Sequence, residues 1–168
     1  MPNWTANTLT LTHNDPAKLQ EFCDAYNSGG VCNHYIPQPE GLGDGWYDWN
    51  VRNWGTKWDF GKDEYTEAAV IEDNKVVISF NTAWSPPVEF YDKLQKMKFM
   101  VYATYFEPGM AFCGIYDNGV DDCINYAGKE DIPDELWDEY GMADFFEEFE
   151  FEDEEEFEDE EEFEEEVE

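Results

Sequence analysis

Residues 75–106 read KVVISFNTAWSPPVEFYDKLQKMKFMVYATYF and predict a strand, a helix and a second strand in succession. Residues 75–81 are rich in β-branched side chains, which favour a strand. Ser85, before two prolines, predicts the N-cap of a helix. Residues 98–106 predict the second strand. The apolar and amide side chains expected along the helix are Val88, Tyr91, Leu94, Gln95 and Met97.

The chain before this unit predicts another strand and helix. Residues 7–12 (NTLTLT) alternate polar and apolar side chains, as strands do. Asp15 and Pro16 suit the N-cap and first position of a helix over residues 16–27. The sequence Ser-Gly-Gly at residues 28–30 ends that helix.

Further strands and a helix complete the predicted set. Residues 68–72 predict a strand that pairs with residues 75–81, whereas residues 31–40 contain two prolines and predict a short extended segment at most. Pro108 and Gly109 occupy the second and third positions of a predicted type II turn. The remaining predictions are strands over residues 111–116 and 120–126, joined by Asn118-Gly119, and a helix over residues 134–140.

This order of elements predicts an α+β fold. Strand, helix, strand pair, helix and strand form the β-α-β-β-α-β pattern of ferredoxin-like domains. We expect an antiparallel sheet with two helices on one face and extra C-terminal hairpin strands. The 168 residues are enough for one domain, over residues 1–143, followed by an acidic tail over residues 144–168.

The tail carries 18 acidic residues in 25 and no lysine or arginine. Such a segment is typically solvated and disordered, and it could serve only to keep the protein in solution. Phenylalanines spaced through the acid favour a second interpretation, a segment that orders on a basic, partly apolar partner. The residues predicted to contact that partner are Asp144, Phe145, Phe146, Glu147, Glu148, Phe149, Phe151, Asp153, Glu154, Glu155, Phe157, Asp159, Glu160 and Phe163.

Charge spacing supports the second interpretation. A helical tail would rise about 1.5 Å per residue. Its 18 carboxylates would then lie roughly one per 2 Å, close to the one charge per about 1.7 Å of duplex DNA.

Net charge limits the class of partner. The chain has 42 acidic and 9 basic residues, a formal charge of −33. Direct binding to nucleic acid or to anionic lipid is therefore disfavoured. We expect no membrane span and no secretory leader, and a cytoplasmic location in a bacterial host.

The residue types of common catalytic and metal sites are too few or wrongly spaced. His13 and His34 are the two histidines, and no Gly-x-Ser-x-Gly motif accompanies them. Cys32 and His34 form a lone Cys-x-His, which is too little for zinc. We predict no catalytic residue, no metal, no cofactor and no enzyme activity.

The four cysteines, Cys23, Cys32, Cys113 and Cys123, are expected to be free thiols. The turn at Asn118-Gly119 leaves two alternatives for the last pair. A three-residue turn would place Cys113 and Cys123 opposite each other, and a two-residue turn would place them on opposite faces.

Residues 46–60 (WYDWNVRNWGTKWDF) are unusually aromatic and predict a short helix that ends at Gly55. The rings could cover one end of a small core. Alternatively, they could form a binding surface on which two cations stack. The residues of that possible ligand surface are Trp46, Trp49, Arg52, Trp54, Lys57, Trp58 and Trp84.

Four short motifs resemble one protein family. They are Met1-Pro2-Asn3-Trp4 with Asn7 and Leu9, Trp54-Gly55-Thr56-Lys57-Trp58-Asp59, Thr82-Ala83-Trp84-Ser85-Pro86-Pro87, and Tyr105-Phe106-Glu107-Pro108-Gly109-Met110 with Phe112 and Gly114. In this order they resemble the YubB-like family of phage and plasmid proteins over about residues 1–126. The resemblance implies a ferredoxin-like fold, a mobile-element origin and no established activity. Thr5 departs from the family, whose members commonly carry Cys there.

Two functions follow as hypotheses. The first is a phage- or mobile-element-encoded inhibitor that uses its acidic, DNA-like surface and tail to bind a basic, nucleic-acid-binding host protein, such as a nuclease or defence complex. The alternative is a module that binds a small ligand or peptide through residues 46–60, with the tail as a solubiliser.

Overall fold

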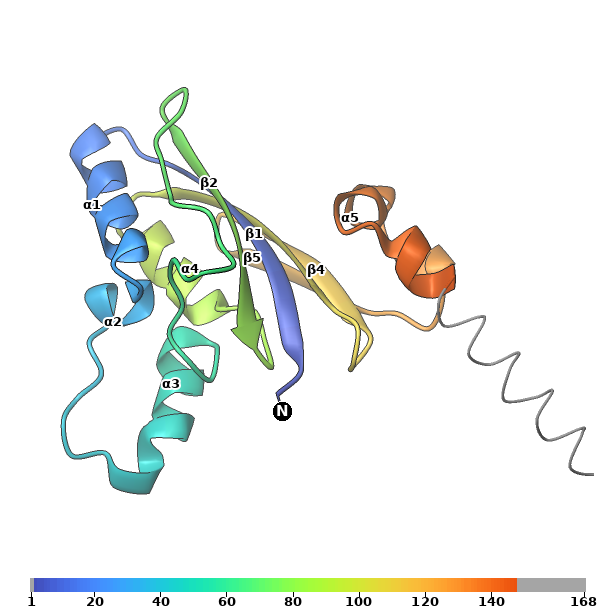
Figure 1. Ribbon diagram of the computed structural model, residues 1–168, viewed down its shortest axis with the longest axis horizontal. Helices are drawn as coiled ribbons and strands as arrows, with labels where there is room; N and C mark the ends of the chain where they lie inside the picture. The colour runs from blue at the N-terminus through green and yellow to red at the C-terminus, as the bar shows by residue number, and fades with distance from the viewer. Residues whose placement is uncertain (1, 148–168) are drawn as a thin grey trace, which may run out of the picture. The chain divides into compact units, whose positions relative to one another are not determined.

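The computed structural model describes residues 2–147, which fall into two compact units, residues 2–131 and residues 132–147 (Figure 1). The first unit contains a five-stranded sheet and four α-helices. The second contains helix α5 (Asp134–Glu139) and a helical segment over residues 142–147. The domain boundary that we predict at residue 143 remains a prediction.

The sheet is antiparallel throughout, with the strand order β2-β1-β3-β4-β5. Its central strand, β1, pairs with β2 on one side and β3 on the other. The strands are β1 (Trp4–Thr12), β2 (Lys75–Ala83), β3 (Met100–Glu107), β4 (Phe112–Asp117) and β5 (Val120–Asn125).

Helices cover one face of this sheet. Strand β1 alternates buried and partly exposed side chains, and Leu9 and Leu11 are completely buried. They share one apolar core with Phe22, Phe90 and Leu94, which come from the helices. Figure 1 shows α1, α2 and α4 together on one side of the strands. The helices are α1 (Pro16–Asn27), α2 (Val31–Tyr35), α3 (Trp46–Trp54) and α4 (Val88–Lys96).

The order of β2, β1 and β3 defines one split β-α-β unit. Since both β2 and β3 are antiparallel to β1, they are parallel to each other, and α4 connects them. The α+β class and the antiparallel sheet are thus as predicted. Helix α1, with Asp15 as its N-cap, and helix α3, which ends at Gly55, also match the prediction.

The strand predicted over residues 68–72 does not form, so the strand pair of the ferredoxin-like pattern is incomplete. A single bridge joins Glu72 and Lys75. The backbone of Ala69 instead bonds to the side chain of Asn27 on α1, with N–O distances of 3.0 and 2.8 Å. Because Asn27 satisfies both polar groups of Ala69, this segment has less need of a strand partner.

Residues 31–35 are helical rather than extended. The Asp59 carboxylate accepts the N–H groups of Cys32 and Asn33 at 2.7 and 2.9 Å, which caps the first turn of α2. This cap comes from 27 residues along the chain, and local sequence does not reveal it.

Two predicted local contacts are also wrong. Ser85 does not cap α4, because its hydroxyl donates to the carbonyl oxygen of Gly55. Near Pro108, the left-handed backbone falls on Ala111 (φ 55°) and not on Gly109. The buried Glu107 carboxylate accepts the N–H groups of Gly109 and Met110 there, both at 2.7 Å.

The hairpin between β4 and β5 settles the cysteine alternatives. Asp117 pairs with Val120, so the turn has two residues, and Cys113 pairs with Ile124 rather than with Cys123. Cys113 is buried, Cys123 is exposed, and both are free thiols.

Candidate functional site

The four motifs meet where β1 begins and where β2 and β3 end. The Trp84 N–H donates to the Asn3 carbonyl at 2.9 Å, and Ser85 bonds to Gly55. A methyl group on Gly109 would lie 2.5 Å from the Asn3 amide nitrogen, so these two residues are in close contact. Segments more than 100 residues apart in sequence therefore build one end of the sheet.

Exposed aromatic rings gather at this end. Trp4, Trp58 and Trp84 are 48%, 40% and 40% exposed. The rings of Trp4 and Trp58 lie 6.0 Å apart between centroids, tilted by 45°. The Lys57 ammonium lies 4.6 Å from the Trp58 ring centroid and 5.8 Å from that of Tyr47. We call Trp4, Tyr47, Lys57, Trp58 and Trp84 the tryptophan surface.

Buried polar side chains form hydrogen bonds with the backbone segments that carry the tryptophan surface. The Asn7 amide donates to Thr82 Oγ1 and to the Thr5 carbonyl, both at 2.9 Å. Thr82 Oγ1 in turn donates to the Ser85 carbonyl at 2.8 Å. Thr56 Oγ1 donates to the Ala83 carbonyl at 3.1 Å. Such buried networks fix the backbone that carries the exposed rings.

The backbone of Lys57 is fixed from both sides. Its N–H donates to the Ala83 carbonyl at 3.4 Å, and its carbonyl accepts from the buried Asn50 amide at 2.8 Å. Gln38 donates to Asn50 Oδ1 at 2.6 Å and holds that amide in place. Two residues later, Asp59 caps α2. Trp58 is therefore an exposed ring on a firmly held backbone.

The predicted ligand residues divide into core and surface. Trp54 is 3% exposed, its indole N–H donates to the Ile36 carbonyl at 2.9 Å, and Trp49 packs edge-on against it at 5.6 Å. For these two residues, the interpretation of core packing is correct. The structure places Trp46, Arg52, Lys57, Trp58 and Trp84 at or near the surface.

Arg52 does not take part in the tryptophan surface. Within residues 2–147 it makes neither an ion pair nor a contact with a ring face. Trp4 and Tyr47 do take part, and the sequence-based set missed them. The signal for Trp4 was its place in the first motif. Trp4 is also one of the even-numbered residues of β1, which face away from the core.

Thr5, the position at which the sequence departs from the resembled family, is completely buried. Its hydroxyl has no hydrogen-bond partner in the part of the chain that the structure describes. A thiol would suit such a site at least as well, because a buried cysteine behaves as a small apolar side chain. This position therefore supports the core and is not an accessible reactive site.

An acidic cluster on α4 and β5 lies beside Gly55, where α3 ends. Glu89 lies directly against Gly55, and burial together with the charges of Asp92 and Asp121 raises the pKa of Glu89. Burial and the neighbouring charges of Asp122 and Asp92 also raise the pKa of Asp121. A nearby cation would stabilise the charged form of these carboxylates.

Buried tyrosines donate to two of these carboxylates. Tyr105 Oη lies 2.7 Å from Asp121 Oδ1, and Tyr116 Oη lies 2.7 Å from Asp92 Oδ1. Burial raises the pKa of both phenols, so they stay protonated as donors.

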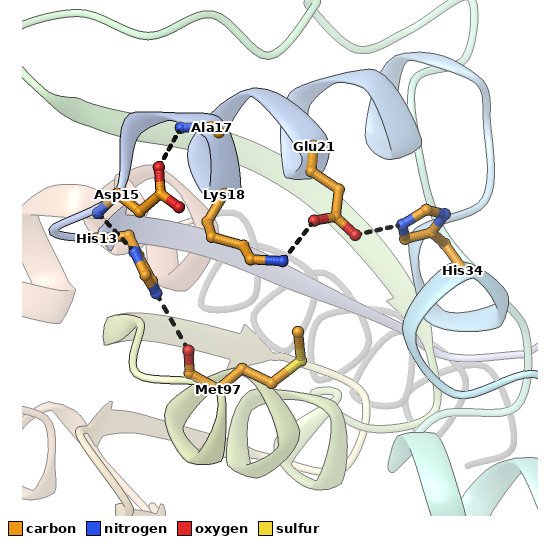
Figure 2. Close-up of polar contacts among 7 residues, drawn as sticks. All are labelled: His13, Asp15, Ala17, Lys18, Glu21, His34 and Met97. Atoms are coloured by element: carbon orange, nitrogen blue, oxygen red, sulfur yellow. Dashed lines mark hydrogen bonds and ion pairs between the residues drawn. The ribbon is translucent and has the colours of Figure 1, made fainter.

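Both histidines make structural contacts. Figure 2 shows Glu21 between Lys18 and His34, with both nitrogens 3.1 Å from its carboxylate oxygens. The hydrogen bonds from His34 and Lys18 lower the pKa of Glu21. His13 accepts the Asp15 N–H at Nδ1, so its Nε2 carries the proton and bonds to the Met97 carbonyl at 3.1 Å.

A shallow groove of about 800 Å³ runs beside the Glu21–His34 pair, between α1 and α2. Asp59, which lines it, already accepts hydrogen bonds from α2. Ser28 and His34 also line the groove, and their side chains bond to the Asp24 carbonyl oxygen at 2.7 Å and to the Glu21 carboxylate at 3.1 Å.

The predicted tail residues are only partly described. Asp144, Phe145, Phe146 and Glu147 lie in the helical segment of the second unit, where Phe146 stacks on Trp137 at 5.2 Å between centroids. The other predicted tail contacts, from Glu148 to Phe163, lie outside the described residues.

No protein-family model, curated protein or solved structure matches this chain. The resemblance to the YubB-like family therefore stays a prediction. Over residues 2–147, no three His, Cys, Asp or Glu side chains are placed to hold a metal ion. No helix in that range has the length and apolar character needed to span a membrane.

Proposed function

We propose that this protein is a non-enzymatic binding protein from a phage or other mobile element, acting in the cytoplasm of a bacterial host. Its target is a basic protein whose nucleic-acid-binding surface it occupies. The observation that carries this proposal is the charge of −33, from 42 acidic and 9 basic residues. The single split β-α-β unit also agrees with a ferredoxin-like ancestry.

The charges of the folded residues support the proposal as well as those of the tail. Glu89, Asp92 and Asp121 repel one another, and the raised pKa values of Glu89 and Asp121 reflect that repulsion in addition to burial. A partner rich in lysine and arginine would relieve it. Complementary fields of this kind speed encounter and select the partner by charge.

The tryptophan surface favours a second candidate function. Trp4 and Trp58 are large, exposed rings on a fixed backbone, and such rings dominate binding energy in protein interfaces. In this alternative, the surface binds a small ligand or peptide and the tail serves only as a solubiliser.

The test compares the full chain with a variant that ends at residue 143. Both are immobilised, exposed to bacterial lysate and washed at low and high salt, and bound proteins are then eluted with duplex DNA. We expect nucleic-acid-binding proteins on the full chain alone, released by salt and by DNA. A variant with Phe149, Phe151, Phe157 and Phe163 changed to Ser keeps every carboxylate and isolates the contribution of the rings.

The opposite result is equally clear. Partners retained equally by both forms, and not displaced by DNA, would overturn the proposal and favour the second candidate. In that case the change Trp58→Ala should abolish retention.

A further inference from the structure

The Lys57 ammonium contacts aromatic rings, although the protein is rich in carboxylates. The ammonium lies over the faces of Trp58 and Tyr47, at 4.6 and 5.8 Å from their centroids. Within residues 2–147 no carboxylate comes within ion-pair distance of it. Both distances are within the range of cation–π attraction. The tryptophan surface thus already holds one cation, supplied by the chain itself.

The site is built to hold a cation in a defined place. Hydrogen bonds to Asn50 and Ala83 fix the Lys57 backbone. The Lys57 ammonium, by contrast, is carried on a flexible four-carbon stem. Trp58 keeps 40% of its surface exposed beside Trp4. The stem can swing away without disturbing the rings, and the ring faces then become available to another group.

We propose that the tryptophan surface binds an arginine side chain of a basic partner protein, and that Lys57 occupies this place in the free protein. This inference rests on the proposed function and adds a contact on the folded residues to the main contact made by the tail. The occupant is inferred to be a cation, because these rings already hold the Lys57 ammonium and the formal charge of −33 favours a basic partner. An arginine fits because its planar guanidinium stacks on aromatic faces and loses less hydration than an ammonium.

The sign of the effect of Lys57 separates this occupant from others. A cationic ligand competes with Lys57, so removal of its charge should tighten binding. An anionic ligand, such as a nucleotide phosphate, would pair with Lys57, and the same change should weaken binding.

The experiment uses the full chain labelled with ¹⁵N and follows the indole N–H signals by NMR. The probe is N-acetyl-L-arginine amide, and the control is N-acetyl-L-citrulline amide, which has a similar shape and no charge. We expect saturable shifts of the Trp58 and Trp4 signals with the arginine probe only. The change Lys57→Gln should raise the affinity several-fold, and the matched change Lys62→Gln should alter it by less than twofold.

The indole signal of Trp54 reports whether each variant is folded, because its N–H donates to the Ile36 carbonyl in the core. In a folded Trp58→Ala variant, the shift of Trp4 should be lost. Equal shifts with citrulline, no saturable shift at Trp58, or weaker binding by Lys57→Gln would each overturn the inference. Capture of DNA-displaceable proteins by the full chain would then still support the proposed function. A positive NMR result without such capture would support the arginine-binding site and overturn the proposed function.

Discussion

Trp84 adopts a backbone conformation that tryptophan rarely takes. Its φ is +76°, in the left-handed region that costs a residue with a Cβ atom about 1–2 kcal/mol. Its N–H bonds to Asn3, and its ring is 40% exposed, so burial of the ring does not explain the strain. Such strain is often kept at functional sites, which agrees with a binding role for the tryptophan surface.

The strain predicts different outcomes for two truncations of Trp84. Both Trp84→Ala and Trp84→Gly remove the same ring, but glycine adopts positive φ without the steric cost. We expect the glycine variant to be more stable than the alanine variant by about 1 kcal/mol. Urea unfolding followed by tryptophan fluorescence measures both free energies. Equal stabilities, or a more stable alanine variant, would show that the backbone at this position is not strained.

Single residues also show what the sequence could reveal of the candidate site. Residues 46–60 are visibly aromatic, and the alternatives of core and binding surface could both be stated. Trp54 proves to be core and Trp58 surface, although they are four residues apart. The difference arises at Gly55, whose left-handed backbone (φ 84°) ends α3 and redirects the chain. A helical periodicity carried past that glycine would place both rings on one face.

At the scale of elements, the acidic cluster between α4 and β5 affects stability with an unusual sign. Burial and neighbouring acids raise the pKa of Asp121, so the folded state favours the protonated carboxyl. Its contribution to stability therefore falls as the pH rises from the ordinary carboxyl pKa through the raised one. Asp63 is the opposite case, because its hydrogen bond from the Tyr65 N–H lowers its pKa, and its contribution is lost as the pH falls.

These signs predict the effects of two matched variants. Asp121→Asn keeps an acceptor for Tyr105 and removes the charge, so it should stabilise the protein at pH 7 and have little effect near pH 3. Asp63→Asn should destabilise the protein at pH 7 and have little effect below its lowered pKa. Chemical unfolding of both variants and of the parent chain, at pH 7 and in the acidic range at and below pH 3, gives the comparison. A destabilised Asp121→Asn variant at pH 7 would contradict the sign of the Asp121 shift.

Elements made by local pattern were predictable, and elements made by distant side chains were not. The Asp15-Pro16 start of α1 and the position of the turn at Asn118-Gly119 were predictable from adjacent residues, whereas the length of that turn was left open until the strand register fixed it at two residues. Helix α2 depends on the Asp59 carboxylate, 27 residues away from Cys32. The absent strand over residues 68–72 depends on Asn27, 42 residues before Ala69. Side-chain hydrogen bonds to the backbone compete with regular structure in both cases.

At the scale of the whole molecule, the charge of −33 opposes folding and favours association with a basic partner. The repulsion within the chain and the attraction to a partner both act over a range that the salt concentration sets. The Debye length falls from about 30 Å at 0.01 M to about 3 Å at 1 M salt. Salt should therefore relieve repulsion within the free chain and weaken its attraction to a basic partner.

This argument predicts opposite responses to sodium chloride in two measurements on the same protein. The thermal midpoint of the free chain should rise between about 0.01 M and 1 M salt, because screened carboxylates repel less. The variant that ends at residue 143 lacks 18 of the carboxylates and should respond in the same direction by a smaller amount. Tryptophan fluorescence suits the measurement, because six of the seven tryptophans lie in residues 2–131. Over the same range of salt, retention of basic proteins by the full chain should fall. A midpoint that stays constant or falls would mean that the acidic residues are already neutralised within the free chain, and such a chain would have little charge left to offer a partner.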